Sequence, residues 1–532
     1  MITEKPLLTV TRSAALLMVS FLLTGPARLE ASVINAASGS LTDISNAVAT
    51  ASPGDTVMVP AGTNVWTATL NLSGVNLQGA GTNATVFIDE VPRVNNGQPL
   101  IYIAATSGSF TEISQFNIRA GVTNTAYNYH GTIVVGGDAP ASWRIDHLQF
   151  DAPYAKAIIV YGMPYAVIDH CLFTMRAEGV IGYGDGYGDA SYATPPNYGG
   201  TNQLYIEDCT FTNIVGTPAA VYDGYAGARV VFRHNLVLND VFVNHGTESS
   251  QRYRSTRTVE VYGNTFIDNN NYDWPTMLRG GTGVIFSNTA TGYRNFGGLY
   301  NYRSTDSFSP WGGVTGFNPW DHNDATQCLA GVHSGPNNST TLVVSNAGWT
   351  ANQWVGYTVN DTNTGRFCLI SGNTSDTLFM VGPKDLAPIT FATGDGFTIY
   401  HCYPALDQVG VGSGDYLYGD GPPWGTLVNA ATGGSTWPHQ VSEPVYIWGN
   451  TLNGNPANVG STYPNIQENR DFFNNTSKPN YTPLFYPHPL TLGGTLTNGA
   501  PVTFAAPTNS IPPVITPPPP LAPPSGLSVF KQ

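Results

Sequence analysis

The densest group of polar residues in the chain lies between positions 223 and 279. It combines arginines, which can hold a carboxylate through two parallel hydrogen bonds, with histidine and glutamate, which can move protons. Such a group could bind a uronate carboxylate while a neighbouring base removes the C5 proton of the sugar, which is β-elimination. The catalytic candidates are Arg279, His245, Arg257 and Glu260, and the substrate-binding candidates are Arg254, Glu248 and Asp223.

A Gly- and Tyr-rich stretch from Gly182 to Asp189 adds Tyr183 and Tyr187 to the substrate-binding candidates. Tyrosine rings can stack on sugar faces and hydrogen-bond through their hydroxyls. The stretch interrupts a repeat, so we expect a loop that projects from the fold. The alternative is that this loop packs on the surface of its own fold.

The same polar residues have a structural interpretation. Arginine and glutamate side chains can form a ladder of ion pairs along a solvated face without any substrate. His147, His170 and His234 stand at corresponding positions of a repeat, where turn residues are expected.

The repeat consists of six short segments in which apolar residues are followed by a polar residue. Asn235, Asn264 and Asn288 take the same place in three of them, 29 and 24 residues apart. Repeats of this length with one strand signal each predict a solenoid, here an all-β parallel β-helix, whereas a β-propeller would need blades of about 40 residues. Asparagine suits a coil corner because it tolerates left-handed backbone and can bond its counterpart one coil away. Residues one coil apart lie about 4.8 Å apart, so distant residues can converge on one face.

Several segments resemble the pectate lyase superfamily of right-handed parallel β-helix proteins, and in particular its secreted bacterial members. Residues 41–51 read as the helix that caps the first coil, and residues 168–171 (IDHC) resemble a "WIDHC" coil. Residues 274–279 (WPTMLR) resemble an "R-x-P-x-x-R" stretch, although Asp273 and Leu278 replace its two arginines and Arg279 follows one place later. The resemblance implies a lyase with calcium as cofactor, for which Asp185, Asp189 and Asp223 could supply oxygens.

The sequence divides into five parts. We expect a signal peptide at 1–31, a capped β-helix at 32–337, a small β insertion at 338–400, a return to the β-helix with a closing segment at 401–500, and a Pro-rich tail at 501–532. The signal peptide predicts a secreted, extracellular or envelope protein. The tail could serve as an envelope tether.

Charge and cysteine content limit the partners. Only 11% of residues are charged and the net charge is −14, which argues against nucleic acid and anionic membranes as partners. No stretch after the signal peptide is long enough for membrane insertion. Of five cysteines, Cys171 and Cys209 fall at the same corner of successive coils, either as buried thiols, which we favour, or as a bridge.

We therefore expect a secreted β-helix protein that interacts with polysaccharide, with lyase action on a uronate-containing glycan as the catalytic hypothesis. The alternative is a non-catalytic cell-surface, adhesion or structural solenoid, because the fold does not determine the activity.

Overall fold

A computed structural model of the chain describes residues 31–93, 98–122, 128–137, 141–184, 186, 188–246, 253–300, 327–355, 357–381, 388–400, 407–413, 417–418, 428–429, 440–461 and 466–492. The expected signal peptide, apart from its last residue, and the Pro-rich tail lie outside the described residues. None of the described helices is long and apolar enough to cross a membrane.

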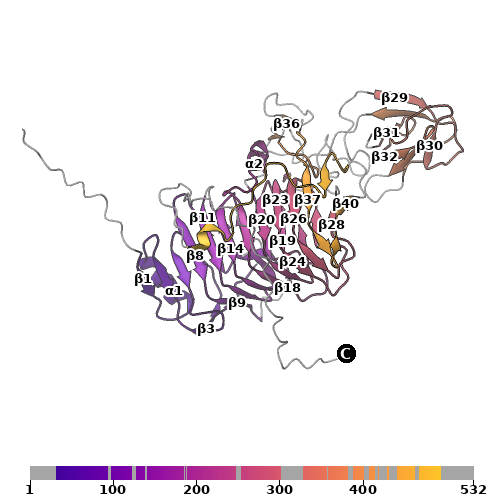
Figure 1. Ribbon diagram of the computed structural model, residues 1–532. Coiled ribbons are helices and arrows are strands. Elements are labelled where there is room, and N and C mark those ends of the chain that lie inside the picture. Colours follow the sequence, from indigo (N-terminus) through magenta and orange to yellow (C-terminus); the bar gives the residue numbers. More distant parts are fainter. Residues whose placement is uncertain are drawn as a thin grey trace, which may run out of the picture.

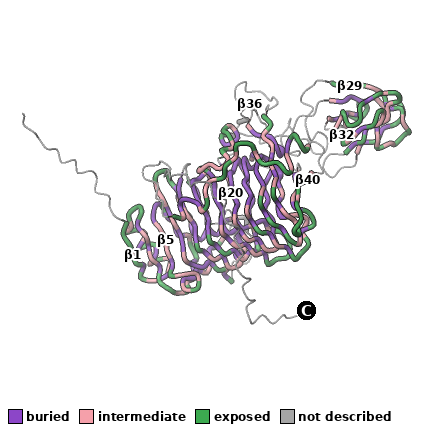
Figure 2. The backbone as a smooth tube through the Cα atoms, viewed as in Figure 1, coloured by how far each residue is buried: buried purple, intermediate pink, exposed green. Residues whose placement is uncertain are grey.

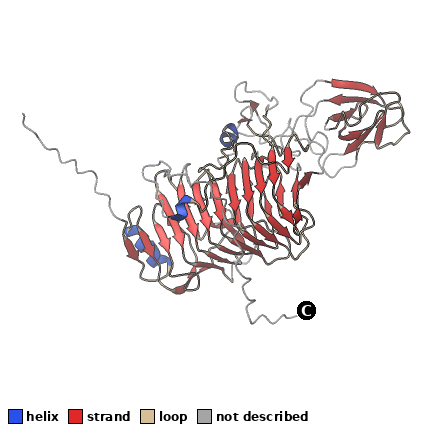
Figure 3. Cartoon of the chain, viewed as in Figure 1, coloured by secondary structure: helices blue, strands red, loops and turns tan. Residues whose placement is uncertain are grey.

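Three long sheets run side by side and receive strands from each coil in turn (Figures 1 and 3). Sheet A has twelve parallel strands. They are β1 (Val33–Asn35), β2 (Thr56–Met58), β5 (Asn76–Gln78), β8 (Phe110–Ser114), β11 (Ser142–Asp146), β14 (Tyr165–Asp169), β17 (Leu204–Glu207), β20 (Arg229–Arg233), β23 (Thr258–Tyr262), β26 (Thr282–Phe286), β37 (Val445–Trp448) and β41 (Phe472–Asn474).

Sheets B and C complete each coil. Sheet B contains β3 (Gly62–Trp66), β6 (Thr85–Asp89), β9 (Asn117–Ala120), β12 (Gln149–Asp151), β15 (Leu172–Met175), β18 (Thr210–Asn213), β21 (Leu236–Leu238), β24 (Thr265–Ile267), β27 (Thr289–Thr291), β38 (Thr451–Leu452) and β39 (Asn455–Pro456). Sheet C contains β4 (Leu70–Leu72), β7 (Ile101–Ala104), β10 (Asn128–Gly136), β13 (Ala155–Tyr161), β16 (Val180–Tyr183), β19 (Tyr222–Tyr225), β22 (Phe242–Val243), β25 (Thr276–Leu278), β28 (Gly297–Leu299) and β40 (Val459–Ser461).

The core lies between the three sheets and runs the length of the coils (Figure 2). Parallel register stacks identical side chains over one another, as with Phe150, Phe173 and Phe211, whose ring centroids are 4.8 and 4.4 Å apart. The coil at the end of the stack has no neighbour on its outer side and would expose its apolar core there, so the stack must be capped. Helix α1 (Leu41–Thr50) caps the first coil with Ile44 and Ala47, and Ser40 accepts a hydrogen bond from the Asp43 amide at its start.

The repeated sequence segments form the corner between sheets A and B. Asn235, Asn264 and Asn288 form a buried ladder in which each backbone amide donates to the side chain of the next asparagine, at 2.9, 3.1 and 3.0 Å, the last being Asn450. Left-handed backbone falls on the residue before the asparagine rather than on the asparagine itself. The predicted turn histidines His147, His170 and His234 are confirmed in this role, with φ of 48°, 53° and 57°.

Cys171 and Cys209 extend this ladder as buried thiols, as favoured from the sequence. The Cys171 amide donates to the Cys209 sulfur at 3.4 Å, and the Cys209 amide donates to Asn235 at 2.9 Å. Burial raises the pKa of the Cys209 thiol well above its usual range.

A six-stranded antiparallel sheet interrupts the coils between β28 and β37. It starts at Gln327 rather than at 338, and its own apolar cluster lies apart from the main core. Figure 1 shows it beside the end of the β-helix that carries β28 and β40. Its strands are β29 (Gln327–Val332), β30 (Thr341–Val343), β31 (Thr358–Asp361), β32 (Phe367–Asn373), β33 (Thr377–Val381) and β34 (Gly396–Tyr400), and a separate pair follows with β35 (Leu417–Tyr418) and β36 (Val428–Asn429).

Residues 478–492, which we call the C-terminal strap, lie on the outer face of sheet A. The strap ends in the short 3-10 helix η1 (Pro489–Leu492), whose Leu490 packs with Tyr165 and Val167 of β14. Beneath the strap, Arg233 pairs with Glu207 at 2.6 Å with both side chains fully buried. Arg233 also donates to the Leu484 carbonyl at 2.7 Å. Much of the polar sequence on this face therefore attaches the strap.

Candidate functional site

A row of aromatic side chains follows the outer face of sheet C. Tyr161, Tyr183 and Tyr225 are register partners at the ends of β13, β16 and β19. Their rings stack at 5.0 and 5.2 Å with interplanar angles of 16° and 13°. Tyr161 is 47% exposed, and the other two are half-buried. The parallel register thus turns three distant tyrosines into one surface row.

His245 and Arg279 continue this row on the next two coils. Tyr222 pairs with Phe242, and Val243 pairs with Met277, so positions 225, 245 and 279 follow one another across the sheet. The ring of His245 stacks on that of Tyr225 at 3.9 Å. The sequence reasoning named His245 and Arg279 but missed Tyr225, although its place two residues after Asp223 on the same strand was a signal.

Asp223, His245 and Tyr225 form a chain of hydrogen bonds. An Asp223 carboxylate oxygen lies 2.5 Å from His245 Nδ1, and His245 Nε2 lies 2.9 Å from the Tyr225 hydroxyl. The carboxylate favours the tautomer that carries its proton on Nδ1, which leaves Nε2 to accept from the tyrosine. This is the arrangement of a nucleophile or acid, a base and an orienting carboxylate.

Arg279, on the next coil, contacts both His245 and Asp223. Its Nη2 atom lies 2.8 Å from His245 Nδ1 and 3.4 Å from each Asp223 carboxylate oxygen, while its Nε donates to the Asn244 carbonyl at 2.7 Å. Asp223 and Arg279 are buried, with 5% and 6% of their surface exposed. Burial alone would raise the pKa of Asp223, but the charges of His245 and Arg279 outweigh it and hold this pKa below its usual range.

Burial also acts on the tyrosine row. It raises the pKa of Tyr183 and of Tyr161, and the neighbouring Tyr253 adds to the effect on both. These two hydroxyls are therefore neutral donors at ordinary pH, suited to binding sugar oxygens.

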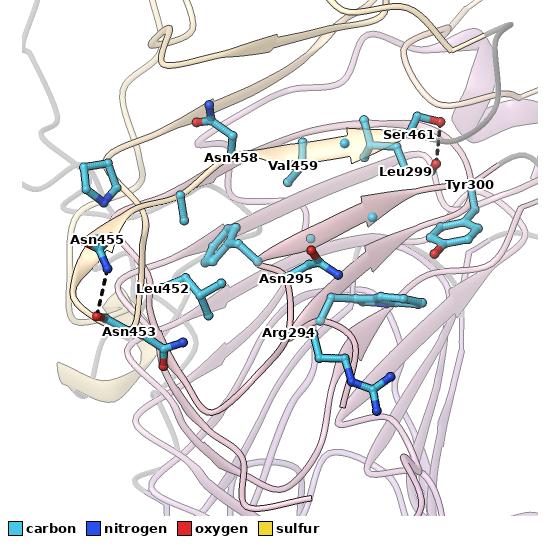
Figure 4. A pocket seen from close by; sticks show the side chains of 17 residues that line it. Arg294, Asn295, Leu299, Tyr300, Leu452, Asn453, Asn455, Asn458, Val459 and Ser461 are labelled. Carbon is cyan, nitrogen blue, oxygen red and sulfur yellow. Dashed lines mark hydrogen bonds between the residues drawn. The ribbon is translucent and has the colours of Figure 1, made fainter. Parts of the chain in front are cut away.

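A cavity of about 710 Å³ lies at the last coils, on the side where the row ends (Figure 4). Leu278 pairs with Leu299, so Tyr300 follows Arg279 in the row, and Tyr300 lines the cavity together with Trp274 at a ring distance of 5.3 Å. The stretch 274–279 thus joins the cavity to the polar group. Other lining residues include Arg294, Asn295, Asn453, Asn455, Asn458 and Ser461.

Three predicted site residues lie apart from the group formed by Asp223, His245 and Arg279. Arg254 is buried against Asp407 at 2.6 Å and lies over the Tyr192 ring. Arg257 is fully buried and pairs with Glu443 at 2.6 Å.

Glu260 is the third of these residues. It belongs to sheet A, where it accepts from the Gly199 amide, from Gln203 and from the Tyr481 hydroxyl at 2.8, 2.9 and 2.6 Å. All three residues have their charge or hydrogen bonds satisfied within the fold. We therefore remove Arg254, Arg257 and Glu260 from the candidate site.

Other predicted positions cannot be placed. Glu248, Tyr187 and Asp185 lie outside the described residues. Tyr183, in contrast, lies in the row, with the ring of Tyr253 against its edge at 6.1 Å. Helix α2 (Asp189–Ala193) follows the predicted loop, and the Tyr192 side chain is buried rather than projecting.

Of the three aspartates that the resemblance suggested for calcium, only the side chain of Asp223 is described, and its oxygens are engaged within the fold. Asp223 Oδ1 accepts from the Gly224 amide at 2.9 Å, Oδ2 contacts His245, and both oxygens face Arg279. These contacts leave little acceptor capacity for a cation. Among the described residues, no three His, Cys, Asp or Glu side chains converge in a way that could hold a metal ion.

The strand order decides the fold class. With three parallel sheets joined coil by coil, the chain is a parallel β-helix. The predicted fold class, an all-β parallel β-helix, is therefore confirmed.

No protein-family model and no curated protein matches the sequence. Among solved structures, an alginate lyase from Paenibacillus sp. str. FPU-7 matches with 13% identity and a TM-score of 0.34, over 51% of this chain and 98% of its own. A tailspike protein of Acinetobacter baumannii bacteriophage Fri1, a capsular polysaccharide depolymerase, matches with 12% identity and a TM-score of 0.29, over 71% and 86%. Pectin methylesterase PemA from Erwinia chrysanthemi matches with 12% identity and a TM-score of 0.25, over 50% and 80%.

Proposed function

We propose that the chain is a polysaccharide lyase that cleaves a uronate-containing glycan at the outer face of sheet C. The observation that carries this proposal is the Tyr225–His245–Asp223 chain of hydrogen bonds, with Arg279 against it. Proton transfer beside a cationic group is what elimination next to a carboxylate requires.

Each residue has a defined role in this reaction. Tyr225 passes its hydroxyl proton to His245 Nε2, and Asp223 stabilises the imidazolium that results. The phenolate takes the C5 proton of the uronate while Arg279 lowers the negative charge that builds up on the sugar's carboxylate. The C4–O4 bond breaks, C4 and C5 become doubly bonded, and His245 supplies the proton that the leaving O4 needs.

The tyrosine row indicates the path of the polymer. Tyr161, Tyr183 and Tyr225 lie one coil apart along the axis of the β-helix, and the cavity with Trp274 and Tyr300 lies beyond the reactive group. A glycan running along this axis would meet hydroxyls at intervals of about 5 Å, close to the length of one sugar residue. The row then binds one side of the cleavage point and the cavity the other.

The test is incubation of the purified chain with neutral and acidic polysaccharides, with new reducing ends and ultraviolet absorbance followed together. Elimination gives both signals, because the product contains a C4–C5 double bond. His245→Asn should abolish both, whereas His170→Asn, which changes an exposed corner histidine, should leave them intact. Reducing ends without absorbance would indicate hydrolysis and contradict the lyase.

A second candidate is a non-catalytic polysaccharide-binding solenoid. It is favoured by the burial of Arg279, which is 6% exposed and already bonded to Asp223 and to the Asn244 carbonyl. Binding of an acidic glycan without any new reducing ends, weakened in Tyr161→Ala, would support this candidate.

We further propose that the protein acts outside the cell and that its Pro-rich tail attaches it to the envelope. The supporting features are the signal-peptide pattern at the N-terminus and the extended composition of residues 501–532. N-terminal sequencing of secreted protein should begin near Ala31 or Ser32. Deletion of 501–532 should move protein from the envelope to the medium.

A further inference from the structure

The cavity at the last coils differs in charge from the polar group on sheet C. Among the described residues that line it, Arg294 alone carries a charge, and its guanidinium is already engaged. Its Nη1 atom donates to Asp273 at 2.8 Å. In the amide orientation that satisfies both groups, its Nε and Nη2 atoms donate to the Asn271 oxygen at 3.1 and 3.2 Å. The guanidinium points away from the other labelled residues in Figure 4. A uronate carboxylate would therefore meet no unpaired cation among the described lining residues.

The wall of the cavity towards sheet C is aromatic and open. The Tyr300 ring lies over Gly298, where a Cβ atom would clash with it, and the Trp274 ring lies 5.3 Å from the Tyr300 ring at an angle of 35°. Gly460 is the register partner of Gly298 on the next coil. Apart from its own chain neighbours, nothing in the described chain comes within 4 Å of the place where its Cβ would stand. The space beside the Tyr300 ring is therefore free, and open aromatic rings can stack on the apolar face of a sugar.

Neutral hydrogen-bonding groups accompany this aromatic wall. The side chains of Trp274, Asn295 and Asn458 have no hydrogen-bond partner among the described residues, so an indole N–H and two amides are available to a ligand. Each amide can donate and accept, which suits the neighbouring hydroxyls of a sugar. Phe296 and Leu452 add apolar surface. The volume of about 710 Å³ lies within the range of about 300–1,000 Å³ that is usual for ligand sites.

We propose that this cavity binds a neutral pyranose residue, with Trp274 and Tyr300 against the sugar ring and Asn295 and Asn458 on its hydroxyls. This binding does not depend on whether the sheet C group cleaves glycan. A second step rests on the proposed lyase: because the cavity follows the reactive group along the row, the substrate is a mixed polymer with a neutral residue beside the uronate. A polymer of uronate alone would place a carboxylate in the cavity and should be a poor substrate.

The test is calorimetric titration of the full chain with β-1,4-linked tetrasaccharides of glucose, galactose, mannose and N-acetylglucosamine, and with tetragalacturonate as the acidic probe. We expect at least one neutral tetrasaccharide to bind saturably. Tetragalacturonate can bind elsewhere on the sheet C row, so the cavity is identified by variants that affect the neutral probe alone. No binding of any neutral tetrasaccharide would overturn the proposal.

Gly460→Val is the sharpest variant, because valine suits a strand and would fill the space beside Tyr300 without a clash. It should weaken binding of the neutral probe at least about tenfold and leave binding of tetragalacturonate unchanged. Asn295→Ala removes one amide from the exposed rim and should weaken binding of the neutral probe about three- to tenfold. Asn83→Ala, at an exposed asparagine on the early coils, is the matched control and should change neither affinity.

Cleavage of polysaccharides is measured separately, so that the two proposals can fail independently. Cavity-dependent binding of a neutral tetrasaccharide without cleavage of any polysaccharide would support the neutral site and contradict the lyase. Cleavage of a uronate-containing glycan, with neutral binding unchanged in both Gly460→Val and Asn295→Ala, would overturn the neutral site and leave the lyase standing. An equal loss of tetragalacturonate and neutral binding in Gly460→Val would also overturn it.

Discussion

The outer faces of sheet A and sheet C carry similar residue types in different surroundings. On sheet A, Arg233 and Glu207 are fully buried beneath the C-terminal strap, and Arg233 donates to Glu207, to the Tyr262 hydroxyl and to two backbone carbonyls of the strap. On sheet C, Asp223 bonds His245, and His245 in turn bonds the hydroxyl of the half-buried Tyr225. In a β-helix, a charged residue is therefore structural or functional according to what covers it.

The largest expected effect is on the proposed reaction at sheet C. Asp223→Asn removes the carboxylate that fixes the His245 tautomer and stabilises its charged form, so the cleavage rate should fall about 10²- to 10⁴-fold. Initial rates measured by ultraviolet absorbance test this, with circular dichroism to verify the fold. An activity within about threefold of the native chain would show that His245 does not act through Asp223.

The largest effect on stability is expected at sheet A. Arg233→Met leaves the Glu207 carboxylate buried and unpaired, which should lower the free energy of unfolding by about 3–5 kcal/mol. Urea denaturation measures the loss, and Arg119→Met, which breaks an exposed pair, should cost less than about 1 kcal/mol. Equal effects of the two substitutions would refute the structural role of the buried pair.

The asparagine ladder holds successive coils together, and both faces depend on that stacking. Its disruption should have an intermediate effect on the free energy of unfolding. Asn264→Ala leaves the buried Asn235 amide without its acceptor and should cost about 1–3 kcal/mol. Asn455→Ala, in the exposed short strand β39, is the control and should be nearly neutral in the same denaturation experiment.

Acid should destabilise the C-terminal strap that covers sheet A. Burial, and after it the charge of Arg233, lower the pKa of His488 to about 3 from its ordinary value of 6.5. The folded state therefore favours neutral His488, and stability is lost as pH falls from about 6.5 towards about 3. The protection factors of the strap amides in hydrogen exchange, which correct for the intrinsic pH dependence of exchange, should fall over this range. His488→Gln cannot titrate and should remove that part of the pH dependence, whereas identical profiles for both proteins would contradict the role of His488.

The smallest effect is expected at the exposed end of the sheet C row. Tyr161→Ala removes one ring and one hydroxyl from the polymer path and should weaken glycan binding by about 1 kcal/mol, roughly fivefold. Affinity electrophoresis can measure the change. Tyr154→Ala, which alters a tyrosine outside the row, should have no effect.

The fold could be predicted from the sequence because the repeat encodes it locally. The equal placement of Asn235, Asn264 and Asn288 fixed a coil corner, and the helix at 41–50 fixed the start of the stack. The polar group could be predicted only in part. Asp223, His245 and Arg279 converge because they hold related places on successive coils.

Arg257 and Glu260 were assigned to that group incorrectly, since their partners are distant in sequence. Glu443 lies 186 residues after Arg257, and Tyr481 lies 221 residues after Glu260. Nothing local indicates that Glu443 returns to pair with Arg257, or that the strap crosses sheet A and brings Tyr481 to Glu260. Grouping residues by their proximity in sequence therefore assigned too many residues to the site. The alternation of side chains between the two faces of each strand was the better guide to its members.

The most direct test of the account is the rate of unsaturated product formation by Tyr225→Phe on an acidic polysaccharide that the native chain cleaves. The substitution keeps the ring that stacks on His245 and removes only the hydroxyl. We predict a loss of at least about 10²-fold in rate with substrate binding and stability retained. Cleavage at the native rate would contradict the assignment of the reaction to the sheet C face.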